Sequence, residues 1–163
     1  MIGWHFSTGK LGYGDGREII IGKTHKVKGP LELCDRGLHA AERIIDALQY
    51  APGPMVYKVK LHGEILRGYD KACATRRTYI AGMDATNILR SFARQCALDV
   101  VHLWDAPDVV VKYLKTGDAT LRDAARAAAW DAACAARDAR DAACAARDAQ
   151  NTRLTEMVEK ELI

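Results

Sequence analysis

A chain of 163 residues is long enough for one domain of ordinary size with an added element, and short for two independent cores. Hydrophobic residues make up 49% of the chain and charged residues 28%, which excludes a wholly disordered, collagen-like or coiled-coil protein. The net charge is +3, with 17 Lys+Arg against 12 Asp+Glu in residues 1–117 and 7 against 9 in residues 118–163. This mildly basic body lacks the dense Lys/Arg stripe of a DNA-binding protein, so a phosphate-bearing small molecule is the expected partner and nucleic acid is not.

The five cysteines are odd in number and form no Cys-x-x-Cys pair, which is typical of reduced thiols rather than of a disulfide framework or a zinc site. No apolar run reaches the roughly 18 residues that a membrane span needs, and the N-terminus lacks a signal-peptide pattern. We therefore expect a cytoplasmic protein with no bound metal, no cofactor and no membrane contact.

The chain begins with features of β-structure. Residues 2–6 are predicted to form a short strand, and the next segment carries four glycines in positions 9–16, which permit tight turns and a mobile loop. Residues 18–21 and 24–27 fit either a hairpin or two short separate strands.

The middle of the chain alternates between helix and strand patterns. Residues 41–50 place apolar side chains on one helical face, and the prolines that follow end the helix. Strict alternation makes residues 55–66 the clearest strand of the chain, and residues 71–82 are a further strand candidate.

Helical signals dominate after Gly82. Asp84 can cap a helix whose apolar positions recur every three or four residues as far as Leu103. Pro107 lies where a second helix would begin, and Gly117 is placed to end it with a left-handed residue. Residues 1–117 are thus predicted to form an α+β body, β-rich at first and helical afterwards.

The tail, residues 118–163, contains an internal repeat in which DAACAARDAR is followed directly by DAACAARDAQ. Alanine has the highest helix propensity, and no Gly or Pro follows Gly117, so one long or once-broken helix is expected. Steps of four and three residues place a seam of alanines on one side of it, at Ala125, Ala129, Ala132, Ala136, Ala139, Ala143 and Ala146. Because such a seam buries little area, we expect the helix to pack closely on a second protomer or on its own body; a solvated single helix is the alternative.

Basic and aromatic residues gather near the glycine loop and the strand at residues 71–82. Arginine forks suit phosphate groups, loop amides add donors, aromatic rings can stack on a base, and histidines can serve acid/base chemistry. The predicted ligand-binding residues are Trp4, His5, Lys10, Tyr13, Arg17, His39, Arg76, Arg77 and Tyr79. Arg76 and Arg77 point to opposite faces of a strand, so at most one of them belongs to any pocket. The loop has neither a GxxxxGK[ST] nor a GxGxxG motif, which excludes a P-loop or Rossmann site.

Six segments of the chain are distinctive: GWHF, LCDRGLHA, DALQYAPGP, DKACATRRT, FARQCALDVVHLWDAP and YLKTGD. In these segments the chain resembles a family of uncharacterised proteins found mostly in bacteriophage genomes and phage-derived metagenomic sequence. Members of that family commonly end in the same kind of Ala/Arg/Asp/Trp-rich helix. The resemblance implies a phage setting inside a bacterial host cell.

In the N-terminal half, WHFSTG is followed by RGLHAAERIIDALQY and then by VYKVKLHGEI. This layout resembles the NAD-binding core of ADP-ribosyltransferases. By this resemblance His5 would contact the ribose of an NAD-like ligand, and His39 would stand where those enzymes have a stacking tyrosine. Such enzymes also need a glutamate on a late strand, and this sequence has none between Ile65 and Glu156.

Three functions fit these observations. The preferred one is a phage-encoded binding protein that captures a nucleotide-like anion without turnover. An NAD-derived host defence signal is one candidate for this anion. The protein would self-associate through its Ala-rich helix. The first alternative is an inhibitor or a structural phage protein that acts through protein contacts alone. An ADP-ribosyltransferase-like enzyme is the second, and the missing late glutamate makes it the less favoured.

Overall fold

The computed structural model describes residues 1–12 and 14–162, with side chains at residues 1–12, 14–142, 145 and 146. These residues form two compact units, Met1–Arg90 and Ser91–Ile163. The first unit holds an antiparallel sheet and the second is helical, so the predicted α+β class is confirmed. The domain boundary expected at residue 117 lies inside the second unit.

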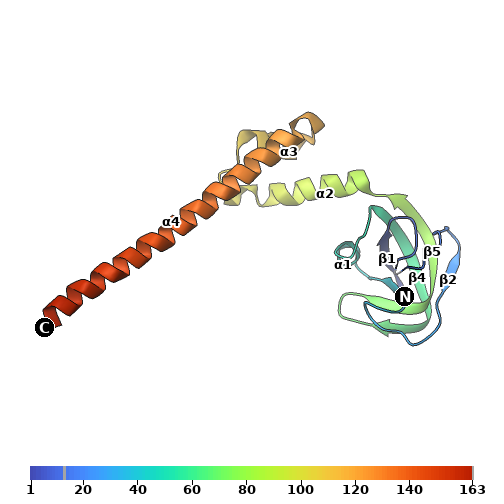
Figure 1. Ribbon diagram of the computed structural model, residues 1–163. Coiled ribbons are helices and arrows are strands. Elements are labelled where there is room, and N and C mark those ends of the chain that lie inside the picture. The colour runs from blue at the N-terminus through green and yellow to red at the C-terminus, as the bar shows by residue number, and fades with distance from the viewer. Residues whose placement is uncertain (13, 163) are drawn as a thin grey trace. The chain divides into compact units, whose positions relative to one another are not determined.

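The first unit is built on a five-stranded antiparallel sheet (Figure 1). Its centre is a long hairpin of β4 (Met55–Arg67) and β5 (Ala72–Asp84), the strands expected from the alternating sequence. Strand β1 (Ile2–Ser7) pairs with β4, whereas β2 (Thr24–Lys26) and β3 (Leu38–Ala40) both pair with β5. Strand β5 is therefore hydrogen-bonded to other strands along both of its edges, and its inward side chains are buried.

Of the two short strands expected at residues 18–21 and 24–27, the second forms as β2 and the first does not, so the hairpin between them is absent and that part of the prediction is wrong. Residues 24–26 pair with β5, but of residues 18–21 Glu18 alone makes a bridge, to Lys10 of the glycine loop. The backbone N–H of Ile19 donates to the Gly9 carbonyl oxygen at 3.0 Å. The glycine loop thus folds on the segment that follows it, which prevents that segment from pairing with β2.

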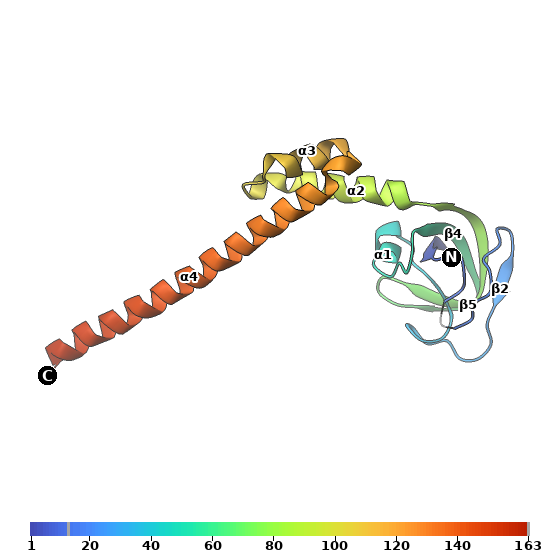
Figure 2. The same cartoon turned by 45° about the horizontal axis from the view of Figure 1, so that its top comes forward.

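The sheet curls so that β1 also meets the chain just after β3. Trp4 and Ala41 exchange two backbone hydrogen bonds of 2.7 and 3.0 Å. Gly3 permits this approach, because a Cβ at that position would lie 2.5 Å from the carbonyl oxygen of Ala41. Helix α1 (Ile44–Leu48) follows the bridge and packs on β1 (Figure 2).

Helix α1 is half as long as the helix expected at residues 41–50. Ala41 is held extended by its bridge to β1, and Arg43 is also extended and gives no side-chain cap. The helix therefore cannot begin before residue 44, because tertiary pairing overrides the helical pattern of the sequence.

The core of the first unit consists of two clusters of buried side chains. The larger comprises Leu11, Ala40, Tyr57, Val59, Leu61, Ala72, Ala74 and Tyr79, and the smaller comprises Phe6, Ala41, Ala47, Val56 and Ala85. Burial of one large apolar side chain contributes about 1.5–3 kcal/mol to stability. The clusters fix the sheet and α1, and with them the residues of the pocket described below.

Helix α2 (Thr86–Asp99) begins in the first unit and continues into the second. Its start is capped as expected, with the Asp84 carboxylate accepting from the Thr86 N–H at 2.8 Å. The helix ends before Leu103, which lies in a short 3₁₀ turn, η1 (Val101–Leu103).

Helix α3 (Asp108–Thr116) follows Pro107 and ends at Gly117. Gly117 has φ +68°, and its N–H donates to the carbonyl oxygen of Tyr113 at 2.8 Å. The left-handed helix end predicted at this glycine is confirmed.

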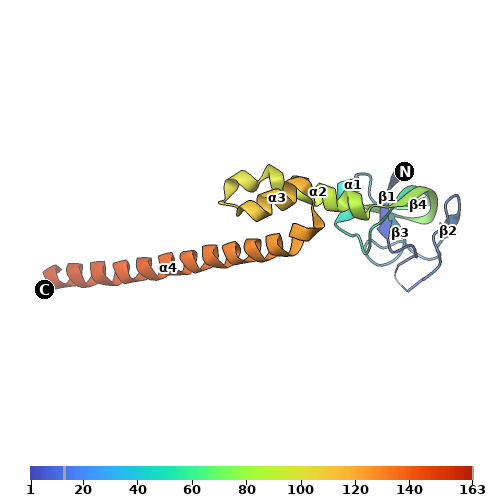
Figure 3. The same cartoon turned by 90° about the horizontal axis from the view of Figure 1, so that it is seen from above.

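The tail forms a 3₁₀ turn, η2 (Ala119–Leu121), and then one helix, α4 (Arg122–Leu162), as predicted (Figure 3). Ala125 is buried near the start of α4, where the helix contacts α3. From Ala133 to Ala142 every side chain is exposed, and Ala143 lies outside the described side chains. Of the seam alanines whose side chains are described, those up to Ala132 are at least partly buried, and Ala136, Ala139 and Ala146 are exposed. None of the described helices is both long and apolar enough to cross a membrane.

Candidate functional site

A pocket of about 480 Å³ lies in the first unit, a size typical of small-molecule sites. Its walls come from β1, the glycine loop, the turn before β3 and the segment that follows α1. Strand β5 contributes Arg77, and Lys71 lies directly before this strand. The pocket is therefore assembled from segments far apart in the sequence.

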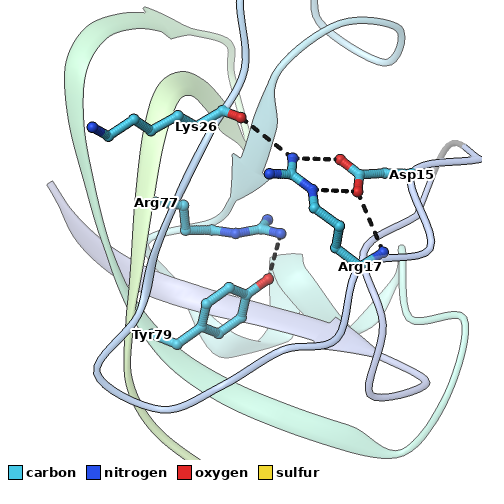
Figure 4. A network of polar contacts seen from close by, with 5 residues as sticks. All are labelled: Asp15, Arg17, Lys26, Arg77 and Tyr79. Atoms are coloured by element: carbon cyan, nitrogen blue, oxygen red, sulfur yellow. Dashed lines mark hydrogen bonds and ion pairs between the residues drawn. The ribbon is translucent and has the colours of Figure 1, made fainter.

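The chemically most unusual lining residue is Arg77, whose side chain is 3% exposed. One terminal nitrogen donates to the backbone carbonyl of His39. The other donates to the Tyr79 hydroxyl at 2.5 Å, as Figure 4 shows. Its Nε has no partner, and no carboxylate of the described residues pairs with the guanidinium. A buried charge without a counter-ion is costly, and an anion in contact with the guanidinium would offset that cost.

Tyr79 positions Arg77 from behind the pocket. Its ring is fully buried and makes edge contacts with Tyr57, His25 and His5, with ring centroids 5.1, 5.6 and 6.2 Å away. Burial raises the pKa of Tyr79 to about 12, so the hydroxyl keeps its proton and accepts from Arg77. The ring has no free face on which a base could stack.

Two histidines line the pocket beside Arg77. Burial, followed by the charge of Arg77, lowers the pKa of His5 well below its usual value and also lowers the pKa of His39. Both imidazoles are therefore neutral at pH 7. Nε2 of His39 accepts from the Cys34 backbone N–H at 3.1 Å, whereas the buried Nε2 of His5 has no partner. His5 thus offers a polar, uncharged group to a ligand.

Three further lining residues were not among the predicted ligand-binding residues: Cys34, Tyr50 and Lys71. Cys34 is exposed and has φ +70°, in a turn that closes with a 2.9 Å bond from the Arg36 N–H to the Glu32 carbonyl. Tyr50 lies just beyond α1, and the Lys71 ammonium is 3.8 Å from the centre of its ring. Cys34 directly precedes the Asp-Arg-Gly turn, which is recognisable in the sequence. No local sequence pattern predicts that Tyr50 and Lys71 lie at the pocket.

The structure brings five of the nine predicted ligand-binding residues to the pocket: Trp4, His5, Lys10, His39 and Arg77. Tyr79 lies behind the lining, and Tyr13 is outside the described residues.

The two other predicted arginines are placed elsewhere. Arg76 is exposed on the opposite face of β5 from buried Arg77, as the alternation of a strand requires. Arg17 pairs with Asp15 through two bonds of 2.6 Å and is not part of the lining (Figure 4). Of the two neighbouring arginines on β5, Arg77 is the one available to a ligand in the pocket.

The carboxylates of the lining belong to Asp15 and Asp35. Hydrogen bonding to Arg17 lowers the pKa of Asp15, which makes this carboxylate a weak base. Within the part of the chain that the structure describes, no three His, Cys, Asp or Glu side chains are grouped to hold a metal ion.

Residues 13–91 are similar to a domain of unknown function, DUF7666. The similar stretch includes most of the pocket lining, except the residues of β1 and the start of the glycine loop. No curated protein and no solved structure matches the chain.

Proposed function

We propose that the first unit binds a small nucleotide-like anion in its pocket and holds it without chemical change. The observation that supports this proposal is Arg77, a buried guanidinium that lines the pocket and has no carboxylate partner among the described residues. A phosphate in contact with its free Nε–H would offset the cost of burying the charge.

The rest of the lining suits the other parts of a nucleotide. His5 and His39 are neutral and can exchange hydrogen bonds with ribose hydroxyls. Trp4 is half-buried in the lining and offers an aromatic surface for a base. Lys10 adds an exposed cation from the glycine loop.

Binding without turnover is favoured because the lining offers no well-placed acid/base pair. Asp15 is engaged by Arg17, and burial beside Arg77 makes His5 a weak base. We expect no hydrolysis of NAD and no transfer of ADP-ribose, which incubation with labelled NAD and host lysate would check. Labelling of a host protein that disappears in His5→Ala would contradict this expectation and favour an enzyme.

We also propose that α4 joins two or more copies of the chain. The supporting observation is that the alanine-rich side chains from Ala133 to Ala142 are exposed in a helix of 41 residues. Small side chains allow close approach of helices, and a second copy would remove this face from water. The narrower ideas of a phage origin, a cytoplasmic location and an NAD-derived host signal rest on sequence patterns and resemblance.

Native mass spectrometry tests whether the pocket retains a ligand. Wild type, Arg77→Met and Arg76→Met would be purified in parallel from the same host cells. We expect a retained compound of nucleotide-like mass in wild type and in Arg76→Met, and none in Arg77→Met. Equal retention in both variants, or a retained compound without an anionic group, would overturn the assignment to Arg77.

A further inference from the structure

Lys71 is a second cation of the same pocket, and one oxygen of the neighbouring Asp70 carboxylate accepts hydrogen bonds from other residues. Asp70 accepts a hydrogen bond from the Tyr50 hydroxyl at 2.6 Å and another from the Gln49 amide at 2.9 Å. Among the described residues no carboxylate forms an ion pair with Lys71. Among the described residues, the pocket thus contains two cations, Lys71 and Arg77, that form no ion pair with a carboxylate.

The position of the Lys71 ammonium is restricted by an aromatic ring. It lies 3.8 Å from the centroid of Tyr50, which is a close cation–π contact. Asp70 in turn fixes the orientation of Tyr50 through the hydroxyl. The ammonium is therefore held in place before a ligand arrives, so less side-chain entropy is lost on binding.

The contact with Cys34, followed by that with Tyr50, raises the pKa of Lys71 above its ordinary value. Lys71 accordingly remains charged throughout the neutral range.

The two cations reach the pocket from different points of one extended segment. Lys71 lies directly before β5 and Arg77 is the sixth residue of this strand, and both residues line the pocket. Six residues of extended chain correspond to roughly 20 Å between α-carbons, so the two side chains enter the pocket at separate positions.

We propose that Lys71 forms a second anion subsite, so that the ligand of this pocket carries two anionic groups, one held by Arg77 and the other by Lys71. This inference rests on the proposed function, since it assigns a second contact to the same ligand. It specifies a nucleotide with two separate phosphate groups, or a compound of equivalent charge, rather than a mononucleotide with a single phosphate.

Calorimetric titration with two probes tests the second subsite. The probes are AMP, which has one phosphate, and adenosine 3′,5′-bisphosphate, which has two. We expect wild type to bind the bisphosphate at least tenfold more tightly than AMP. Lys71→Met should remove that preference while changing the affinity for AMP less than about threefold, and Arg77→Met should weaken both probes.

Lys60→Met is the matched control, because Lys60 is an exposed lysine of β4 that does not line the pocket. It should leave both affinities unchanged. Equal binding of the two probes by wild type, or a loss of AMP affinity in Lys71→Met as large as the loss of bisphosphate affinity, overturns the second subsite and leaves the Arg77 site intact. Failure of wild type to bind either probe overturns the proposed function for nucleotides and the second subsite with it.

Discussion

The sheet of the first unit and the long helix α4 are stabilised in different ways. The sheet depends on pairing between distant segments and on fully buried side chains such as Tyr79 and Val59. Among the side chains of α4 that the structure describes, Ala125 alone is buried, and the helical form follows from the propensity of alanine. A buried, unpaired cation persists only where the surrounding core can offset its cost, which is why we propose binding in the first unit. For α4, with its exposed alanines, we propose a role in assembly.

The largest expected effect is on assembly. A stop after Ala132 keeps Ala125 packed near α3 and removes the exposed part of α4. We expect the full chain to sediment as an oligomer at micromolar concentration and the truncated chain as a monomer with an unchanged pocket. A monomeric full chain in analytical ultracentrifugation would contradict the assembly role.

The next largest effect is on the free energy of unfolding, which includes the cost of burying the Arg77 cation. Tyr79→Phe removes the hydroxyl that accepts from Arg77 and should lower the free energy of unfolding by about 1–3 kcal/mol. In a domain of this size each kcal/mol corresponds to roughly 4–8 °C in Tm. The double variant Arg77→Met/Tyr79→Phe removes the charge as well and should recover most of that loss. Equal Tm values for the single and double variants would contradict the account.

A smaller effect is expected from the aromatic wall of the pocket. Trp4→Leu should weaken AMP binding about three- to tenfold, because an aromatic contact is worth about 0.5–1.5 kcal/mol. Binding of ribose 5-phosphate, which has no base, should be unchanged. Trp130→Leu is the control, since Trp130 is an exposed tryptophan of α4. Calorimetric titration showing equal losses for both probes would rule out stacking on Trp4.

The smallest effect is a dependence of stability on pH. His25 is fully buried, neither ring nitrogen has a hydrogen-bond partner, and desolvation lowers its pKa in the folded protein. As pH falls below about 6.5, the unfolded chain takes up a proton that the folded chain does not, so stability decreases. His5 and His39 act in the same direction.

His25→Leu removes one of these groups and should reduce the loss of Tm between pH 7.5 and pH 5.5. Thermal melts at both pH values measure this loss. An unchanged acid sensitivity in the variant would show that His25 is not one of the groups responsible.

Much of the fold was predictable because its signals are local. Alternation identified β4 and β5, Asp84 and Gly117 marked helix ends, and strand parity separated Arg76 from Arg77. The failures came from tertiary pairing. The bridge from Ala41 to β1 shortens α1, and the glycine loop prevents residues 18–21 from forming a strand.

The candidate site was predictable in part for the same reason. Alternation along a strand shows which residues share a face, but it does not show how deeply that face is buried. The sequence therefore predicts that Tyr79 stacks on a base of the ligand, although its ring is fully buried. The pairing of Arg17 with Asp15 depends on the path of the glycine loop. Tyr50 and Lys71 meet only because the segment after α1 lies beside the start of β5.

The central claim is that Arg77 is the anion-binding group of the pocket. Calorimetric titration of AMP into wild type, Arg77→Met and Arg76→Met tests it most directly, because the two arginines are neighbours on opposite faces of one strand. We predict a loss of affinity of about ten- to a hundredfold in Arg77→Met and wild-type affinity in Arg76→Met. Wild-type affinity in Arg77→Met, with both variants folded, would contradict the account.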